Sequence, residues 1–386
     1  MISPRRRAVT ASWTVVLACV LVAAATVVGA ASQGSARPAA AASPALARPE
    51  TDVYTAACVA CHGPDGRGAP RDLVGFDLAL PDFTDCAFAT AEPDPDWFAV
   101  VHEGGPIRGL GRQMPAFGDA LSADDITAAL QRVRAFCTDA RWPRGDLNLP
   151  RPLFLEKAFP ENEVVVTTAA AASGPTAVTT TLLFEKRLGA RSQIEAMVPI
   201  AVQASPSGGT VHGFGDVAVG AKQTLVASMR SGTIFSAGGE VIFPTGDEAQ
   251  GLGAGVTVFE PALMAGQLLP HNSFIHAHGG VEFPSDSQKA DREAFVRAAA
   301  GTTFAAHHGF GRSWTPQIEA LWARPFHGAS EWDLVPQLQV SLSKLQHVLV
   351  AGGVRIPITE RSERHPQAVM YFLWDFFDGG LFDYWK

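Results

Sequence analysis

A pentapeptide in the first third of the chain combines two thiols with an imidazole: Cys58-Val59-Ala60-Cys61-His62. Two cysteines three positions apart can add to the two vinyl groups of a haem, and the adjacent histidine then becomes an axial ligand of the iron. The alternatives are a thioredoxin-like redox pair on a βαβ unit and half of a zinc site. The flanking sequence does not indicate a βαβ unit, and Cys86 and Cys137 form no second Cys-x-x-Cys pair. The pattern therefore predicts one covalently attached haem c.

A Met/His cytochrome needs a thioether as the second axial ligand of its iron, delivered by a loop well downstream of the histidine. Met114 is the single methionine between residues 50 and 150, and the proline after it and a nearby glycine predict a loop. His102 is the alternative, which would give a bis-histidine haem. We interpret it instead as the end of a short helix that begins at Asp94-Pro95. The predicted axial ligands of the iron are therefore His62 and Met114.

Two helical patterns flank these residues. The segment 51–61 can form a first helix that carries the thiols, and Ser122-Ala123-Asp124-Asp125 is typical of a capping box at a helix start. An apolar stripe at Ile126, Leu130 and Val133 follows the capping box. We expect this stripe to pack against the first helix.

Residues 52–138 resemble the small single-haem cytochrome c family. The resemblance rests on CVACHGPDGRG and on the segments VHEGG, MPAFGDALSADDI and VRAFC, which follow in that order. It implies an all-α fold in which Cys58 and Cys61 carry the haem thioethers, while His62 and Met114 bind the iron. It also implies one-electron transfer rather than catalysis.

The first 31 residues have the pattern of a secretory signal peptide. Three arginines at positions 5–7 precede a low-polarity run from Ala8 to Ala31. An uncleaved anchor helix is the alternative, since the run is long enough to span a bilayer. Residues 32–49 are rich in Ala, Ser and Pro and predict a flexible linker. We therefore expect the rest of the chain to be exported, where disulfides can form.

Cys86 and Cys137 both lie in the haem module. A disulfide between the middle of the module and its last helix is one interpretation, and two buried thiols are the other. The cytochrome c pattern does not require the bridge, and the sequence leaves both interpretations open.

Charge separates the haem module from the rest of the chain. The whole chain has 386 residues and a formal net charge of −8, and residues 50–150 alone contain 16 Asp and Glu against 8 Lys and Arg. The lack of a long basic stripe argues against nucleic-acid binding. An acidic electron-transfer module is expected to dock on a redox partner protein with a basic face.

Beyond about residue 160 the apolar residues alternate with polar ones, as in strands with two different faces. Leu334 and Leu338 fall on one face of such a segment, and Gln337 and Gln339 fall on the other. We count about twelve segments of about 9–15 residues, bounded by Gly, Pro, Ser or Asp. Their centres lie near residues 166, 182, 196, 220, 238, 260, 277, 299, 319, 338, 351 and 371. This length suits strands that cross a membrane as a closed barrel.

Three segments of this region, FGDVAVGAKQTL, GGEVIFPTGDEAQGLG and the closing YFLWDFFDGGLFDYWK, resemble outer-membrane β-barrel proteins of the small channel or transporter type. The resemblance implies an antiparallel transmembrane β-barrel in contact with outer-membrane lipid. A soluble β-sandwich or propeller is the alternative, although no repeat of about 40–50 residues is visible. His276 and His278 share a strand face and could bind a metal, but such pairs are more often unliganded.

The fold class is therefore multidomain, with an all-α domain followed by an all-β barrel of about twelve strands. The predicted parts are a signal peptide (1–31), a flexible linker (32–49), a cytochrome c haem domain (50–142), a Pro-rich linker (143–160) and a β-barrel domain (161–386). The predicted function is haem c-dependent one-electron transfer at the periplasmic side of an outer membrane, without enzymatic activity. Two alternatives remain: a porin-like transporter whose haem domain is a plug, gate or sensor, and a soluble periplasmic oxidoreductase.

Overall fold

The computed structural model describes residues 52–205, 208–305, 309–362, 364–377 and 380–382. The predicted signal peptide and the flexible linker after it lie outside these residues. Within the described part of the chain, no helix is both long enough and apolar enough to cross a membrane.

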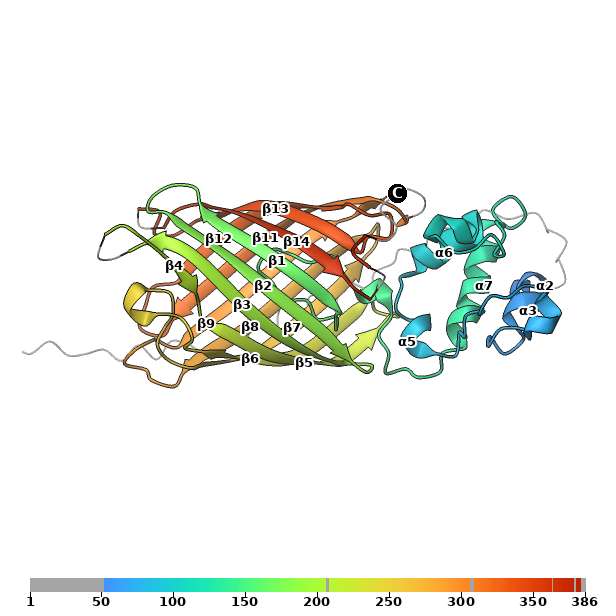
Figure 1. Cartoon of the computed structure of the whole chain (residues 1–386), viewed down its shortest axis with the longest axis horizontal. Coiled ribbons are helices and arrows are strands. Elements are labelled where there is room, and N and C mark those ends of the chain that lie inside the picture. The colour runs from blue at the N-terminus through green and yellow to red at the C-terminus, as the bar shows by residue number, and fades with distance from the viewer. Residues whose placement is uncertain (1–51, 206–207, 306–308, 363, 378–379, 383–386) are drawn as a thin grey trace, which may run out of the picture. The chain divides into compact units, whose positions relative to one another are not determined.

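Residues 52–147 form a helical module (Figure 1). Its helices are α2 (Val53–Ala57), α3 (Val59–His62), α4 (Arg71–Val74), α5 (Cys86–Ala89), α6 (Asp94–Glu103) and α7 (Ala123–Ala135), with 3-10 turns η2 (Gly105–Arg108) and η3 (Gly145–Leu147). The predicted capping box is present at α7, where Ser122 Oγ accepts the N–H of Asp125 and the Asp125 carboxylate accepts the N–H of Ser122. The side chains of the predicted stripe on α7 are buried.

The first predicted helix is in fact two short helices, α2 and α3, which meet at Cys58. The backbone φ of Cys58 is −114°, which turns the chain without breaking the hydrogen bonds on either side. Tyr54 of α2 is buried against Val133 and Phe136, and the Tyr54 and Phe136 ring centroids lie 5.2 Å apart. The expected packing between the first helical segment and α7 is therefore present.

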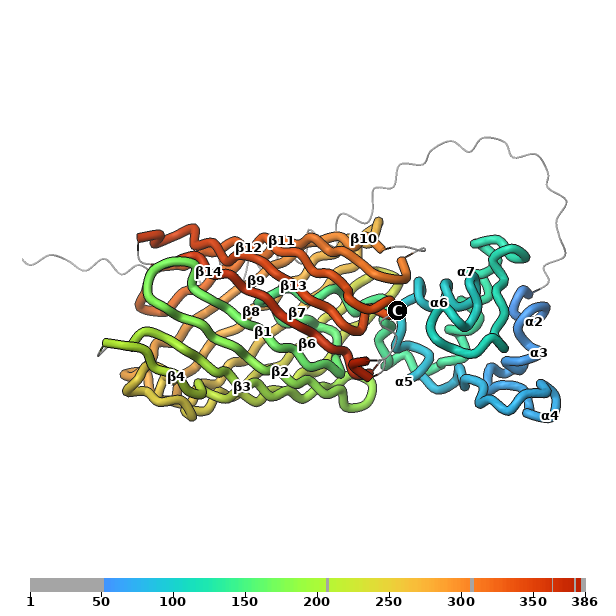
Figure 2. Tube along the Cα trace, turned by 45° about the horizontal axis from the view of Figure 1, so that its top comes forward, coloured from blue at the N-terminus to red at the C-terminus, as the bar shows by residue number. Residues whose placement is uncertain are grey.

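Residues 163–375 form a closed antiparallel barrel (Figures 1 and 2). Its strands are β1 (Glu163–Ala171), β2 (Ala177–Leu188), β3 (Ser192–Ala204), β5 (Val217–Ser228), β6 (Thr233–Phe243), β7 (Val258–Leu269), β8 (Ser273–Pro284), β9 (Glu293–Thr302), β11 (Ser313–Pro325), β12 (Glu331–Ser341), β13 (Val348–Pro357) and β14 (Gln367–Asp375). The short strands β4 (Thr210–Phe214) and β10 (Phe304–Ala305) pair with β3 and β11, and the 3-10 turn η4 spans Glu248–Gln250.

Two pairings close the barrel: β1 with β14, and β9 with β11. Closure leaves no unpaired edge along the twelve long strands, as a barrel in hydrocarbon requires. Each of the twelve segment centres predicted from the sequence falls inside one of these strands. The predicted fold class is confirmed.

The barrel is apolar outside and polar inside. On β12, Leu334 and Leu338 point outward and are 38% and 39% exposed, whereas Gln337 and Gln339 point inward and are 7% and 3% exposed. The alternation that predicted the strand therefore separates its outer face from the lumen, which is the interior of the barrel. This polarity is the reverse of that of a soluble protein and is typical of a barrel surrounded by lipid.

The segment predicted as a Pro-rich linker, 143–160, is packed against its neighbours in the structure. Its start belongs to the haem module, since the N–H of Gly145 donates to the Thr90 carbonyl. After Leu147 it belongs to the barrel, because Phe159 packs in a core with Ile234 of β6, and Leu147 at the end of the module contacts the same core. Sequence composition indicated a linker because the prolines separate a helical region from an alternating one, but it could not indicate which surface covers the leucines between them.

Candidate haem site

The Cys58–His62 segment forms one helical turn. The N–H of His62 donates to the Cys58 carbonyl over 2.9 Å, and the N–H of Cys61 donates to the same oxygen over 3.2 Å. Residues three and four apart lie on one face of a helix, so Cys58, Cys61 and His62 face the same side. The two thiols are free in the structure. Burial, together with the Asp52 carboxylate, raises the pKa of the Cys58 thiol, which is therefore neutral at neutral pH.

Tyr54 and two glycines hold the end of this turn. The Tyr54 hydroxyl donates to the Gly63 carbonyl over 2.8 Å. Gly63 and Gly66 both have positive φ, at 74° and 77°, which glycine adopts without steric cost. A Cβ on Gly66 would lie 2.6 Å from the Phe136 ring, so the chain can pass this ring only as glycine. Backbone conformation therefore requires glycine at positions 63 and 66, and packing against Phe136 requires it at position 66 as well.

The imidazole of His62 is largely buried. Its ring stacks on Phe83 with centroids 4.9 Å apart, and Phe83 in turn contacts Trp97 edge-on at 5.7 Å. Among the described residues its Nδ1 atom is buried without a hydrogen-bond partner. Burial lowers the pKa of His62, which favours the neutral imidazole that binds iron. Sequence reasoning did not identify Phe83, because it lies in a loop where no periodicity marks it.

Met114 lies in a separate loop after η2, as the proline and glycine pattern predicted. Its carbonyl accepts the N–H of Gly105 over 3.0 Å, and the loop returns to α6 where Gly118 N–H donates to the His102 carbonyl. A Cβ on Gly104 would lie 3.1 Å from the Met114 carbonyl, so this glycine permits the close approach. The loop is thus attached to α6, and iron ligation by Met114 stays a prediction.

His102 lies in the last turn of α6, and this helix begins at Asp94 as predicted. Its Nδ1 atom lies 2.8 Å from the Glu103 carboxylate, and its ring stacks on Phe98. A Cβ on Gly118 would lie 2.7 Å from the His102 ring, so this imidazole packs against the backbone of the Met114 loop. In the structure His102 therefore packs between α6 and that loop.

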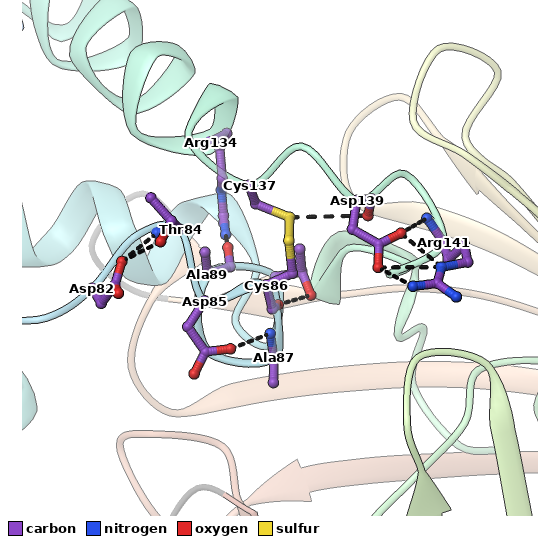
Figure 3. The surroundings of a disulfide bond; sticks show 11 residues. Asp82, Thr84, Asp85, Cys86, Ala87, Ala89, Arg134, Cys137, Asp139 and Arg141 are labelled. Atoms are coloured by element: carbon purple, nitrogen blue, oxygen red, sulfur yellow. Dashed lines mark hydrogen bonds and ion pairs between the residues drawn. A yellow bond between two sulfur atoms is a disulfide. The ribbon is translucent and has the colours of Figure 1, made fainter. Parts of the chain in front are cut away.

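Cys86 and Cys137 form a disulfide with a Cα–Cα distance of 5.1 Å (Figure 3). The bridge connects α5 to the residues after α7, which settles the alternative that the sequence left open. Arg134 lies beside it, and its guanidinium donates to the carbonyls of Ala89 and Glu92. These contacts fix the α5–α6 connection to the C-terminal part of α7. The sequence did not point to Arg134, which is only one of the arginines of an amphipathic helix.

The donor set of the module fits a covalently bound haem. Two free thiols lie on one helical face with a largely buried imidazole whose Nδ1 is unpartnered, and a thioether lies in a loop further along the chain. The two histidines of β8 that could have bound a metal, His276 and His278, instead contact backbone groups inside the barrel. His276 Nε2 lies 3.0 Å from the Pro150 carbonyl, and His278 Nδ1 accepts the N–H of Glu156 over 3.4 Å. The predicted shared face of His276 and His278 is therefore the lumen face of β8.

Family profiles match both parts of the chain. The family described as cytochrome C oxidase, cbb3-type, subunit III matches residues 45–131. The family described as putative MetA-pathway of phenol degradation matches residues 161–368, which is more than half of the chain. The search of curated proteins finds no match.

Solved structures of outer-membrane barrels are similar to the β-region. An outer membrane channel from Pseudomonas putida F1 is 14% identical, with 58% of this chain and 99% of that chain covered and a TM-score of 0.41. The NanC porin is 10% identical, with 55% and 98% covered and a TM-score of 0.40. A KdgM porin in complex with disordered oligogalacturonate is 10% identical, with 55% and 99% covered and a TM-score of 0.36. With a cytochrome c-type domain ahead of its barrel, the chain belongs to the family described as putative MetA-pathway of phenol degradation.

Proposed function

We propose that this protein is a membrane-anchored electron carrier with one haem c, held by Cys58 and Cys61 and ligated by His62 and Met114. The observation that carries the proposal is the helical turn in which the two thiols and the largely buried imidazole share one face. When bound, haem c supplies an iron that exchanges one electron between its ferrous and ferric states.

The residues of the module have separate roles in this function. The Phe83 ring packs on His62 and limits its rotation, while the Tyr54 hydroxyl holds the backbone at the end of the same turn. A thioether from Met114 raises a haem potential relative to a second histidine. Electron transfer is the proposed activity, and no group of the module is assigned a catalytic step.

The outer surface of the barrel supports a place in the outer membrane. Large apolar side chains are exposed on its strands, among them Leu182, Ile194, Ile318 and Leu338. Lipid tails would cover these side chains, whereas a soluble periplasmic oxidoreductase would expose them to water.

The loop lengths support a periplasmic haem domain. The strand pairs β2–β3 and β7–β8 are joined by three residues each, 189–191 and 270–272, whereas 244–257 and 285–292 form longer connections at the other end of the strands. Outer-membrane barrels have short turns on the periplasmic side and longer loops outside. The haem module precedes the first residue of β1, which pairs with the last residue of β14 at the short-turn end.

An acidic haem module would favour a redox partner protein with a basic docking face. Residues 50–150 carry an excess of eight carboxylates over Lys and Arg, from 16 against 8. Such complementarity mainly accelerates encounter, so the rate of electron transfer should fall as the salt concentration rises.

The test is a set of cysteine variants of the full chain, made in a host with haem-maturation machinery. Cys58→Ala combined with Cys61→Ala should abolish covalent haem in a denaturing gel stained for haem. Cys86→Ala combined with Cys137→Ala is the matched control, because it also removes two thiols of the same module and should retain the haem. Haem that stays covalently bound in the first variant would overturn the proposed attachment.

Iron ligation and location are tested on the same preparations. Met114→Ala should remove the methionine–iron absorption band of the oxidised protein and lower its reduction potential. His102→Gln keeps a polar side chain of similar length between α6 and the Met114 loop, and it should retain the band. A Met114 variant with an unchanged spectrum would exclude that ligand. Proteolysis of intact and permeabilised cells distinguishes the sides of the membrane, since a periplasmic haem domain is cleaved only after permeabilisation.

A further inference from the structure

The chain between the haem module and β1 fills the lumen of the barrel. In residues 149–161 the apolar side chains Leu149, Leu155 and Phe159 are buried, and so are the cations Arg151 and Lys157, at 8% and 4% exposure. We call this segment the plug. Charged side chains are rarely this buried unless they are paired, so the lumen must supply their partners.

The barrel wall binds the backbone of the plug. The Glu319 carboxylate of β11 accepts three consecutive N–H groups, from Leu153 at 3.0 Å, Phe154 at 3.2 Å and Leu155 at 3.0 Å. It also accepts the amide of Gln337 over 2.7 Å. A buried carboxylate with four donors is fully satisfied, so this contact specifies the position of the plug.

Other strands bind seven further polar groups of the plug backbone. The pairs are His276 with Pro150 O, Tyr371 with Arg151 O, Arg297 with Phe154 O, His278 with Glu156 N, Lys222 with Lys157 O, Ser236 with Ala158 O and Gln193 with Glu161 N. Gln193 on β3 and Glu319 on β11 lie six strands apart in a barrel of twelve. Opposite walls thus hold one segment, which therefore crosses the lumen instead of lining one side of it.

A row of carboxylates winds around the inside of the same barrel. Its members are Asp375 on β14, Glu163 on β1, Glu185 on β2, Glu195 on β3, Glu240 on β6, Glu260 on β7, Glu282 on β8 and Glu293 on β9. The strand register pairs Asp375 with Glu163, Glu185 with Glu195, Glu240 with Glu260 and Glu282 with Glu293. On β5 the row passes through Gly220, where a Cβ would lie 2.4 Å from a Glu195 oxygen. The row runs from the last residue of β14 to the first residue of β9, which lie at opposite ends of the barrel.

The plug supplies cations to the first part of this row. Arg151 pairs with Glu163 and, over 2.6 Å, with Glu185. Lys157 lies 3.6 Å from Glu163 and pairs with Glu161 of the plug itself. These two side chains neutralise carboxylates that would otherwise repel one another in a confined space.

We propose that the barrel is a closed channel for small cations, in which the plug blocks the lumen and Arg151 and Lys157 occupy the places of permeating ions. A row of carboxylates along a pore attracts cations and excludes anions. In this conformation plug cations occupy the first part of the row, at Glu163 and Glu185, and the plug crosses the lumen, so ions can pass only when the plug leaves. The proposal needs the barrel to insert in a bilayer, as proposed above, and is independent of haem chemistry.

The test is single-channel recording of the full chain in a planar lipid bilayer under a KCl gradient. The wild-type protein should stay closed for most of the record. A variant in which residues 149–160 are replaced by a Gly/Ser stretch of equal length should conduct steadily, with a reversal potential on the side expected for K⁺. In this opened barrel, Glu240→Gln, Glu260→Gln and Glu282→Gln together should move the reversal potential toward zero.

Two controls separate this proposal from failure of the barrel to fold or insert. Heat-dependent migration in a denaturing gel reports whether each variant is a folded barrel, and Glu319→Gln provides a milder way to loosen the plug. Lys186→Gln is the matched control for loss of a cation: Lys186 is exposed on β2 next to Glu185 and lies outside the plug. This substitution should leave the channel closed. A wild-type barrel that is steadily open, a folded and inserted plug variant that does not conduct, or an opened barrel that prefers Cl⁻ would each overturn the proposal.

Discussion

The haem module and the barrel bury opposite kinds of side chain. The module places apolar side chains such as Tyr54, Ile126 and Val133 inside and leaves most of its charges on the surface; the buried Asp96 is paired with Arg108. The barrel places Gln193, Glu319 and many other polar residues inside and leaves leucines such as Leu334 and Leu338 on its outer face. The difference shows that burial alone does not define a core: the surrounding medium decides which face must be covered, and an interior of polar groups is stable when each has a partner.

The two parts also differ in what constrains them. The module has short helices, and a disulfide and packed aromatic residues hold them together. The barrel is constrained along its whole length by the pairing of neighbouring strands. Substitutions should therefore affect the two parts through different mechanisms, and the following predictions test this.

Loss of the disulfide should have the largest effect on the module. Cys86→Ala combined with Cys137→Ala frees a loop with a sequence separation of 51 residues, for which loop-closure entropy predicts a loss of about 4 kcal/mol. Denaturant unfolding followed by the helical circular dichroism signal, which comes from the module, measures the loss, and barrel migration in a gel should not change. An unchanged midpoint would mean that packing alone holds α5 to α7.

A charge placed on the outer face of the barrel should have the next largest effect, and it should lower the stability of the barrel. Leu338→Arg places a charge on the outer face of β12 and should cost about 2–4 kcal/mol in a bilayer, because the guanidinium would face lipid. Folding titrations in lipid vesicles measure this cost. A neutral result would contradict the assignment of this face to lipid.

Removing the Tyr54 hydroxyl should have a moderate effect. Tyr54→Phe keeps the packing of the ring but leaves the Gly63 carbonyl without its buried donor. The lost hydrogen bond should cost about 1–3 kcal/mol. The same unfolding measurement detects the loss. The variant should retain covalent haem, since neither the thiols nor His62 is altered, and its loss would indicate that the hydroxyl is needed to form the turn.

The smallest effect should come from the start of α7. Ser122→Ala removes the hydroxyl that accepts the N–H of Asp125 and should destabilise the module by about 1 kcal/mol. Thr127→Ala is the matched control within the same helix, because its hydroxyl bonds only a carbonyl of the preceding turn. Equal losses in the two variants would argue against a specific role of the capping box.

The sequence by itself determined the local chemistry and the strand count. The CVACH turn needs only five consecutive residues, and a helical turn brings its thiols and imidazole to one face wherever it occurs. Alternation along each strand determined its two faces, since side chains of a strand point to opposite sides in turn. These features depend on neighbours in sequence, and therefore they could be predicted.

The tertiary structure decided which distant residues meet. The disulfide between Cys86 and Cys137, the stacking of Phe83 on His62 and the three N–H groups at Glu319 join residues that no periodicity connects. The same holds for residues 149–161, whose prolines indicated a linker although the lumen binds their backbone. Strand register and barrel closure placed the carboxylates of eight strands in one row, because only the pairing of neighbouring strands fixes which residues lie side by side.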